Sequence, residues 1–194
     1  PEGEASLSKW INLGKAQAER IGVEAVSVIA HDRNDANDPR VADLVRDAGL
    51  IYLSGGNPTF LANTLRETLL WNEIESAWRD GAALAGCSAG AMALADHIPA
   101  LRLPTHTATN GLGLVPHIRV LPHFDKMFAR IPDFMTRFMK VPDGVSVVGI
   151  DEDTAIVGGP FEWEVQGRQS AWLFIAGHRK EFKSGQTLVT PKIS

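Results

Sequence analysis

The sequence has little cysteine, little net charge and no long apolar segment. Its one cysteine, Cys87, has no partner for an internal disulfide or a cysteine-rich zinc site, so we expect a reducing compartment, the cytoplasm. The 19 Lys and Arg residues are outnumbered by 23 Asp and Glu residues, without the positive excess typical of nucleic-acid-binding proteins. No run approaches the roughly 20 apolar residues that span a bilayer. We therefore expect neither nucleic acid nor a membrane as a partner.

What is present is the composition of one globular domain: 194 residues, 44% of them hydrophobic. Helical and strand patterns alternate as far as about residue 151, which is typical of a parallel sheet with helices on both faces, and short β-rich runs follow. No linker or repeat divides the chain. We predict a single α/β domain over residues 1–194, with a doubly wound, mostly parallel sheet and a β-rich C-terminal end. Because such folds normally open with a strand and this chain opens with a helix, we expect an N-terminal strand to be missing.

The individual elements follow from periodicity and end signals. Asp38 and Pro39 are typical of a helix start, and we expect that short helix to end at Gly49. Longer helices are predicted over residues 7–20, 58–70, 72–79 and 89–96. Strands are predicted over residues 24–30, 50–54, 82–86, 118–122 and 145–150, and then over 154–159, 161–167, 171–177 and 187–190.

The clearest chemical signal is the pentapeptide 86–90, Gly-Cys-Ser-Ala-Gly, between a predicted strand and a predicted helix. This is the context of a nucleophile elbow, a tight turn that lifts a serine hydroxyl above the sheet and needs small residues at Gly86 and Gly90. The other interpretation is a glycine-rich turn with a capping serine. Ser88 is the expected nucleophile, whereas Cys87 stands one position early and is expected to point into the fold.

A serine nucleophile needs a base and an acid that orients it. Of the six histidines, His123 follows the predicted strand 118–122, at the sheet edge where sites of α/β folds form. The next strand, 145–150, is followed by Asp151, Glu152 and Asp153. Spacing alone allows any of the three to hold the histidine, and a solvated acidic turn is the structural alternative.

A second glycine turn, residues 54–58 (Ser-Gly-Gly-Asn-Pro), also joins a strand to a helix. The backbone N–H of Gly56 is a candidate donor to a substrate oxygen, and Asn57 either caps the helix or binds substrate. A plain helix-entry turn is the alternative. The spacing is not that of a phosphate-binding P-loop, and no histidine pair or carboxylate cage indicates a metal.

Four segments in this order resemble the peptidase E and cyanophycinase family of serine peptidases: IYLSGGNPTFLANTL, GAALAGCSAGAMAL, GLGLVPHIRVLPHFD and VVGIDEDTAIV. The resemblance covers roughly residues 21–159 and implies a class I glutamine amidotransferase-like fold. It implies Ser88 as nucleophile, His123 as base and, in the cyanophycinase-like branch, Glu152 as the third member. In the peptidase E branch the acid lies between serine and histidine, where Asp96 stands too close to Ser88.

The function we expect is therefore a serine peptidase that works through an acyl-enzyme, with the N–H groups of Gly56 and Ala89 holding the oxyanion and no cofactor. The resemblance implies small peptide substrates with an acidic residue beside the scissile bond, although the arginine-rich segment of cyanophycinases is only partly matched. The candidate substrate-binding residues are Asn57, Asp125 and Arg130, with Lys126 as a further carboxylate partner.

Two alternative functions place the chain in other classes of protein. One is an α/β-hydrolase-type esterase, in which Ser88 works with Asp151 or Asp153 and with His178. The other is a non-catalytic member of the family that binds peptides in the same cleft. As a further partner we expect a second copy of the chain, in a homodimer.

Overall fold

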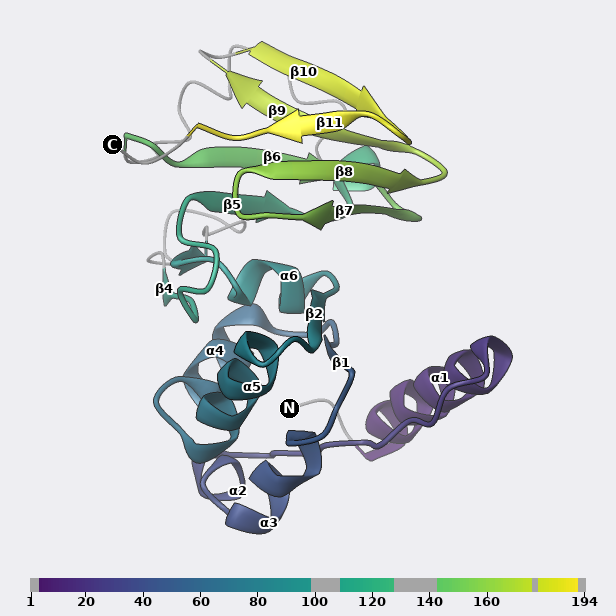
Figure 1. The fold of residues 1–194 in the computed structure, drawn as a ribbon, viewed down its shortest axis with the longest axis vertical. Coiled ribbons are helices and arrows are strands. Elements are labelled where there is room, and N and C mark those ends of the chain that lie inside the picture. The colour runs from purple at the N-terminus through teal and green to yellow at the C-terminus, as the bar shows by residue number, and fades with distance from the viewer. Residues whose placement is uncertain (1–3, 99–108, 128–142, 176–177, 192–194) are drawn as a thin grey trace. The chain divides into compact units, whose positions relative to one another are not determined.

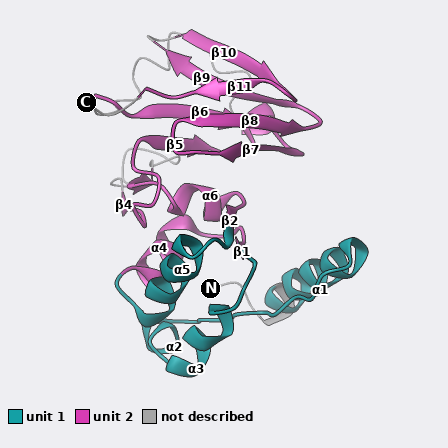
Figure 2. Cartoon of the chain, in the orientation of Figure 1, with its two compact units in different colours: residues 1–51, 67–83 teal, residues 52–66, 84–194 magenta. Residues whose placement is uncertain are grey.

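The computed structural model describes residues 4–98, 109–127, 143–175 and 178–191. The chain forms two compact units, coloured separately in Figure 2. Unit 1 contains residues 1–51 and 67–83, and unit 2 contains residues 52–66 and 84–194. The chain crosses from one unit to the other at residues 51–52, 66–67 and 83–84. These crossings lie within or directly after secondary structure and not in a linker. A single domain over residues 1–194 stays a prediction.

Unit 1 is mainly helical, as Figure 1 shows. The predicted first helix is confirmed as α1 (Glu4–Ile21), and Gly22 follows it with a φ of 74°, a left-handed conformation that glycine adopts without strain. Trp10 and Leu13 on this helix are 51% and 52% exposed. The other helices of the unit are α2 (Arg33–Ala36), α3 (Pro39–Ala42), η1 (Asp43–Val45) and α5 (Leu69–Arg79).

Two predictions in unit 1 are wrong. Residues 24–30 form no strand, and Val26, within this segment, is 58% exposed. A strand-type sequence forms a strand only where a neighbouring strand satisfies its backbone, and no described strand pairs with this segment. The short helix does begin at Asp38, whose side chain accepts the Arg40 N–H, but helical structure ends at Val45 and not at Gly49.

Two strand-to-helix turns carry the glycine motifs. Strand β1 (Leu50–Leu53) pairs with β2 (Ala83–Gly86). After β1 the chain enters α4 (Pro58–Leu65), and after β2 it enters α6 (Ala89–Ala93). Both turns belong to unit 2 and were expected from the sequence.

The rest of unit 2 is rich in β-structure, again as predicted (Figure 1). A four-stranded sheet has the order β10-β9-β6-β5, in which β5 and β6 are parallel and the other neighbours antiparallel. A three-stranded antiparallel sheet has the order β11-β8-β7, and β3 pairs with β4. The fold is thus mixed α/β. The strands are β3 (His97–Ile98), β4 (Thr109–Asn110), β5 (Ile118–Leu121), β6 (Ser146–Ile150), β7 (Thr154–Gly158), β8 (Glu162–Gly167), β9 (Ser170–Ile175), β10 (His178–Lys183) and β11 (Thr187–Val189).

The core of unit 2 lies on both faces of this four-stranded sheet. Successive side chains of a strand point to opposite faces, so Val148 and Val147 of β6 belong to two different apolar clusters. Val148 packs with Val165 of β8 and Leu188 of β11, which are fully buried. Val147 packs with Phe124, the first residue of α7 (Phe124–Met127). Burial on both faces fixes the register of β5 and β6. The register in turn sets the positions of the residues that follow the carboxyl ends of the two strands.

Candidate active site

Ser88 occupies the turn between β2 and α6 with a φ of 52° and a ψ of −109°. This is a strained conformation for a residue with a side chain, of the kind that is concentrated at functional sites. A Cβ at Gly86 would lie 2.7 Å from the backbone nitrogen of Ala91, and one at Gly90 would collide with the carbonyl group of Leu53. The backbone around Ser88 therefore leaves no room for a Cβ at either flanking position.

His123 lies between Ser88 and Glu152. Its Nε2 is 2.8 Å from Ser88 Oγ, and its Nδ1 is 2.6 Å from Glu152 Oε1. A carboxylate only accepts hydrogen bonds, so a neutral His123 donates Nδ1–H to Glu152 and leaves Nε2 to accept the Ser88 hydroxyl proton. The side chains of His123 and Glu152 are 38% and 41% exposed, so a ligand can approach them from solvent.

Parallel pairing of β5 with β6 places the two carboxyl ends side by side, with Leu121 opposite Gly149. His123 comes two residues after Leu121 and has a φ of 53°, which turns the chain sharply into α7. Phe124 then packs against β6, where a Cβ at Gly149 would lie 2.7 Å from its ring. The absence of a side chain at Gly149 thus leaves room for the buried ring that follows His123.

The three consecutive carboxylates have three different partners. Only Glu152 bonds to His123. Asp151 is buried, and it accepts the indole N–H of Trp172 at 3.0 Å and the backbone N–H of Ser170 at 3.2 Å. Asp153 forms an exposed ion pair with Arg168 at 3.7 Å. Burial raises the pKa of the Asp151 carboxyl, and the hydrogen bonds from Trp172 and Ser170 offset only part of that rise.

Asp125, a predicted substrate contact, bonds within the protein. Its Oδ1 accepts the backbone N–H of Glu152 at 2.9 Å, and its Oδ2 is 3.4 Å from Lys126 Nζ. Burial acts to raise the pKa of Asp125, but the bond from Glu152 and the charge of Lys126 outweigh burial and lower that pKa. Arg130 lies outside the described residues, so its predicted substrate contact has no structural counterpart.

The second glycine turn lies beside Ser88. A Cβ at Gly55 would be 3.5 Å from Ser88 Cβ, so this turn and Ser88 are in close contact. Gly56 has a φ of 126°, which side-chain-bearing residues rarely adopt. Asn57 caps α4 by accepting the Phe60 N–H at 3.0 Å, in agreement with one of its two expected roles. Ala89, the other expected oxyanion donor, is the first residue of α6.

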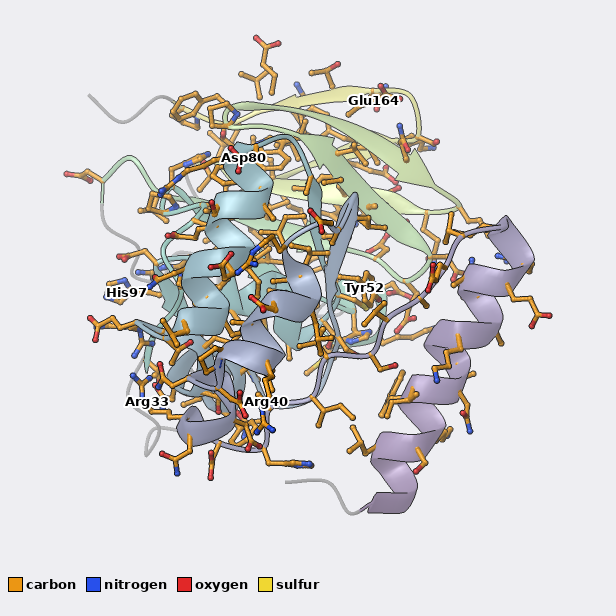
Figure 3. The ribbon with its side chains drawn as sticks, turned by 60° about the horizontal axis from the view of Figure 1, so that its bottom comes forward. Arg33, Arg40, Tyr52, Asp80, His97 and Glu164 are labelled. Carbon is orange, nitrogen blue, oxygen red and sulfur yellow. The ribbon has the colours of Figure 1, made fainter. Side chains whose placement is uncertain are left out.

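Cys87 is exposed, and the prediction that it points into the fold is wrong. Its backbone N–H bonds to the carbonyl of Leu53, while its thiol lies by Tyr52 of β1, labelled in Figure 3. Partial burial, the hydrogen bond with Cys87 and the charge of the thiolate all raise the pKa of Tyr52. The partner of the thiol is thus a phenol, whereas the hydroxyl of the next residue, Ser88, has an imidazole.

The alternative site residues have partners elsewhere. His178 is the exposed first residue of β10, where it pairs with Ile175, and the histidine bonded to Ser88 is His123. Asp96 bonds to the neighbouring His97, labelled in Figure 3, at 2.6 Å. In the described part of the chain, no three His, Cys, Asp or Glu side chains are arranged to hold a metal ion. None of the described helices is long and apolar enough to cross a bilayer.

A family model supports the resemblance found in the sequence. The model of peptidase family S51 matches residues 8–159. The chain belongs to peptidase family S51. Two cyanophycinases, from Synechococcus elongatus and Thermosynechococcus vestitus, are each 34% identical to it in an alignment of 144 residues that covers 69% of this chain and 44% of theirs. The chain thus spans less than half the length of these curated relatives.

Two solved structures resemble this chain in fold. A peptidase from an acI-B1 actinobacterium superposes with a TM-score of 0.85 at 39% identity, over 97% of this chain and 78% of its own. A protein described as a candidate peptidase E from Listeria monocytogenes EGD-e superposes with a TM-score of 0.51 at 22% identity, over 80% of this chain and 76% of its own. The second likeness concerns the fold alone.

Sequence reasoning missed the contacts that hold the backbone of Glu152 in place. Its N–H is bound by Asp125, and its carbonyl accepts the hydroxyl of Thr154 at 3.1 Å. A signal was available for the first contact, because Asp125 follows His123 by two residues and a mostly parallel sheet was predicted. The place of Phe124 against Gly149 could have been inferred from the same pairing.

Proposed function

We propose that this S51 chain is a serine peptidase in which Ser88 is the nucleophile, His123 the base and Glu152 the acid of a catalytic triad. The observation that carries the proposal is the continuous row of two hydrogen bonds, 2.8 Å and 2.6 Å long, through the two nitrogens of one imidazole. A nucleophile, a base and a group that orients the base are the parts this chemistry needs. The backbone of Ser88 supports a nucleophile elbow in addition.

In the proposed reaction, His123 Nε2 takes the proton of the Ser88 hydroxyl as Oγ attacks the carbonyl carbon of a peptide bond. The imidazolium then gives this proton to the leaving amine as the C–N bond breaks, and an acyl-enzyme remains. Water, activated by the same nitrogen, releases the acid and regenerates Ser88. Glu152 accepts the Nδ1–H throughout, which keeps the tautomer and stabilises the imidazolium. Every step uses protein groups and water.

For the oxyanion we propose the backbone N–H groups of Ala89 and Gly56. Ala89 is the first residue of α6 and follows the nucleophile directly, as an oxyanion donor does in a nucleophile elbow. The turn that contains Gly56 lies against Ser88, as the 3.5 Å separation at its neighbour Gly55 indicates. Removing a single oxyanion-hole donor typically costs about 100- to 1,000-fold in kcat.

As substrates we propose small peptides with an acidic residue beside the scissile bond. Asn57 and Arg130 are the proposed contacts, with Lys126 as a further cation, whereas Asp125, predicted as a contact, accepts the backbone N–H of Glu152. The ammonium of Lys126 is on a side chain that is 69% exposed, so it can reach a substrate carboxylate as well as Asp125. The test compares kcat/KM for Asp peptides and their Asn counterparts, and equal values would contradict an acidic preference. Two relatives of this chain are cyanophycinases, so cyanophycin belongs in the same comparison.

We also propose that the strands and helices belong to a doubly wound, class I glutamine amidotransferase-like arrangement. Two features support it. The β5 and β6 strands are parallel, and the proposed catalytic residues follow the carboxyl ends of strands, where open α/β sheets form their sites. A homodimer and a cytoplasmic location stay predictions, to be tested by sedimentation and by fractionation.

The deciding experiment is labelling with a fluorophosphonate, which reacts with an activated serine. We expect the wild type to be labelled and Ser88→Ala to be unlabelled and inactive. The loss of a triad serine costs on the order of a million-fold in kcat in a well-studied protease. A folded wild type that is neither labelled nor hydrolytic would indicate the non-catalytic alternative. Loss of activity in His178→Ala with retention in His123→Ala would indicate the esterase alternative.

A further inference from the structure

Glu152 is held in place by its backbone more than by packing around its side chain. The side chain is 41% exposed, yet its Oε1 stays 2.6 Å from His123 Nδ1. Both backbone polar groups of Glu152 are bound by side chains, the N–H by Asp125 and the carbonyl by Thr154. An exposed carboxylate on a free backbone would sample many positions, so these two bonds restrict where the carboxylate can lie.

The hydrogen bond between Glu152 and Asp125 closes a small ring of contacts that includes His123. His123 and Asp125 are separated by one residue, and both bond to Glu152, one through the carboxylate and the other through the backbone N–H. Between them, Phe124 is 2% exposed and is wedged against Gly149 of the neighbouring strand. Three consecutive residues, 123–125, thus contact β6 or the residue Glu152 that follows its end, which couples the position of the histidine to that of the glutamate.

The carboxylate of Asp125 is suited to this bond. Its side chain is 18% exposed, so water competes little for it, and a carboxylate is a stronger acceptor for an N–H than a neutral oxygen is. Lys126, 3.4 Å away and mostly exposed, balances its charge. The other backbone anchor, Thr154, starts the next strand, so Asp125 is the one that connects Glu152 to the segment of the base.

We propose that Asp125 is a positioning residue that fixes Glu152 against His123, and that this is its main role in catalysis. The inference rests on the proposed function of the same site, and it differs from a substrate contact in what it predicts. A positioning residue acts on the chemical step, because misalignment of the base by about 1 Å costs on the order of 100-fold in rate. A substrate contact that is equal in ground and transition states acts on KM instead.

The first test measures whether substitutions of Asp125 change kcat or KM. In Asp125→Ala we expect kcat to fall about 10- to 100-fold with KM nearly unchanged. The kcat of Asp125→Glu, in which the carboxylate is displaced by one methylene, should fall similarly. This variant replaces Asp125→Ala in the test if the alanine variant does not fold. Asp125→Asn keeps an oxygen for the Glu152 N–H and should recover most of the wild-type kcat. Asp153→Asn is the matched control, because Asp153 pairs only with exposed Arg168 in the described contacts, and it should behave as the wild type.

The second test asks whether Asp125 acts through Glu152. In a Glu152→Gln background the carboxylate to be positioned is gone, so adding Asp125→Ala should change kcat less than about threefold, far from additivity. An equal loss in both backgrounds would overturn the inference. So would a rise in KM at constant kcat in both Asp125→Ala and Asp125→Asn, which would identify a substrate contact.

A third measurement separates failure of this inference from failure of the proposed function. The proton in the His123–Glu152 bond should give a downfield NMR resonance in wild type, whether or not hydrolysis is detected. We expect it to be lost in Glu152→Gln, broadened in Asp125→Ala and retained in Asp125→Asn. If the wild type is not labelled by fluorophosphonate, the proposed function fails. If it is labelled while Asp125→Ala shows wild-type labelling and an unchanged resonance, the positioning role alone fails.

Discussion

Gly149 lies outside the proposed triad, yet we expect Gly149→Ala to disable it. The added methyl group would lie 2.7 Å from two ring atoms of Phe124 and 3.2 Å from a third. Ordinary carbon–carbon contacts are roughly 3.5 to 4.0 Å, so ring and strand must separate by about 1 Å. Phe124 is 2% exposed and lies beside Trp172 and Phe174, with ring centroids 5.7 and 5.6 Å away, so a shift of the ring disturbs its packing with these neighbours.

This displacement passes directly to the preceding residue, His123. Its bonds of 2.8 Å to Ser88 and 2.6 Å to Glu152 do not survive a shift of about 1 Å, and such misplacement costs on the order of 100-fold in kcat. Overpacking of a core typically costs about 1 to 3 kcal/mol of folding free energy. For a chain of this length, 2 kcal/mol corresponds to a fall in Tm of roughly 4 to 8 °C.

The assay compares kcat, the rate of fluorophosphonate labelling and Tm in Gly149→Ala and in a control, Gly49→Ala. A Cβ at Gly49 meets nothing within 4 Å and its φ is not in the left-handed region, so the control should match the wild type. Adding Phe124→Leu to Gly149→Ala removes the obstructing ring and should recover part of the activity. A Gly149→Ala protein with wild-type kcat would refute the reasoning that the ring positions the histidine.

Other contacts around the site give predictions of their own. Cys87→Ser should retain most of the peptidase activity, because the thiol contacts Tyr52; inactivity like that of Ser88→Ala would contradict this. Asp151→Ala should lower the free energy of unfolding by about 2 kcal/mol in urea titrations, since it leaves the Trp172 indole N–H without its acceptor, and an unchanged midpoint would refute it. Asp125→Asn should be less stable than wild type at neutral pH. Because the folded-state pKa of Asp125 is lowered, its contribution is present above the ordinary value of 3.8 and is lost as the pH falls through the folded value. The difference in Tm should thus close below about pH 4, and a gap that widens in acid would contradict the assignment.

Much of the fold followed from the sequence where local pattern and tertiary environment agree. The apolar run at residues 145–150 is buried on both faces as β6, and Asn57 with Pro58 starts α4 as the cap rules predict. Segment 24–30 has an equally strand-like composition but no described strand beside it. Strand β10 was missed for the opposite reason. It lies at a sheet edge, where charged residues such as Lys180 and Lys183 keep the apolar pattern weak and only Phe182 is buried.

The histidine bonded to Ser88 was predictable from residues and topology, because a parallel pair of strands brings its two carboxyl ends together. His123 follows one of those ends and the acidic run 151–153 follows the other. The conformation of His123 was not predictable in the same way. Its φ of 53° is rarely adopted by residues other than glycine, and the next residue, Phe124, packs against Gly149.

The choice among the three carboxylates depends on donors far away in the sequence. Alternation of side chains predicts that Asp151 and Glu152 diverge, but it does not say which of them meets His123. Asp151 is held on its side by the indole of Trp172, which is in register with Gly149 through the antiparallel pairing of β9 with β6. Glu152, whose backbone N–H is bound by Asp125, points its carboxylate to Nδ1 of His123. The role of each carboxylate in such a run is therefore set by which strand pairs beside it, and identifying β9 as the neighbour of β6 is the step that would make the acid predictable.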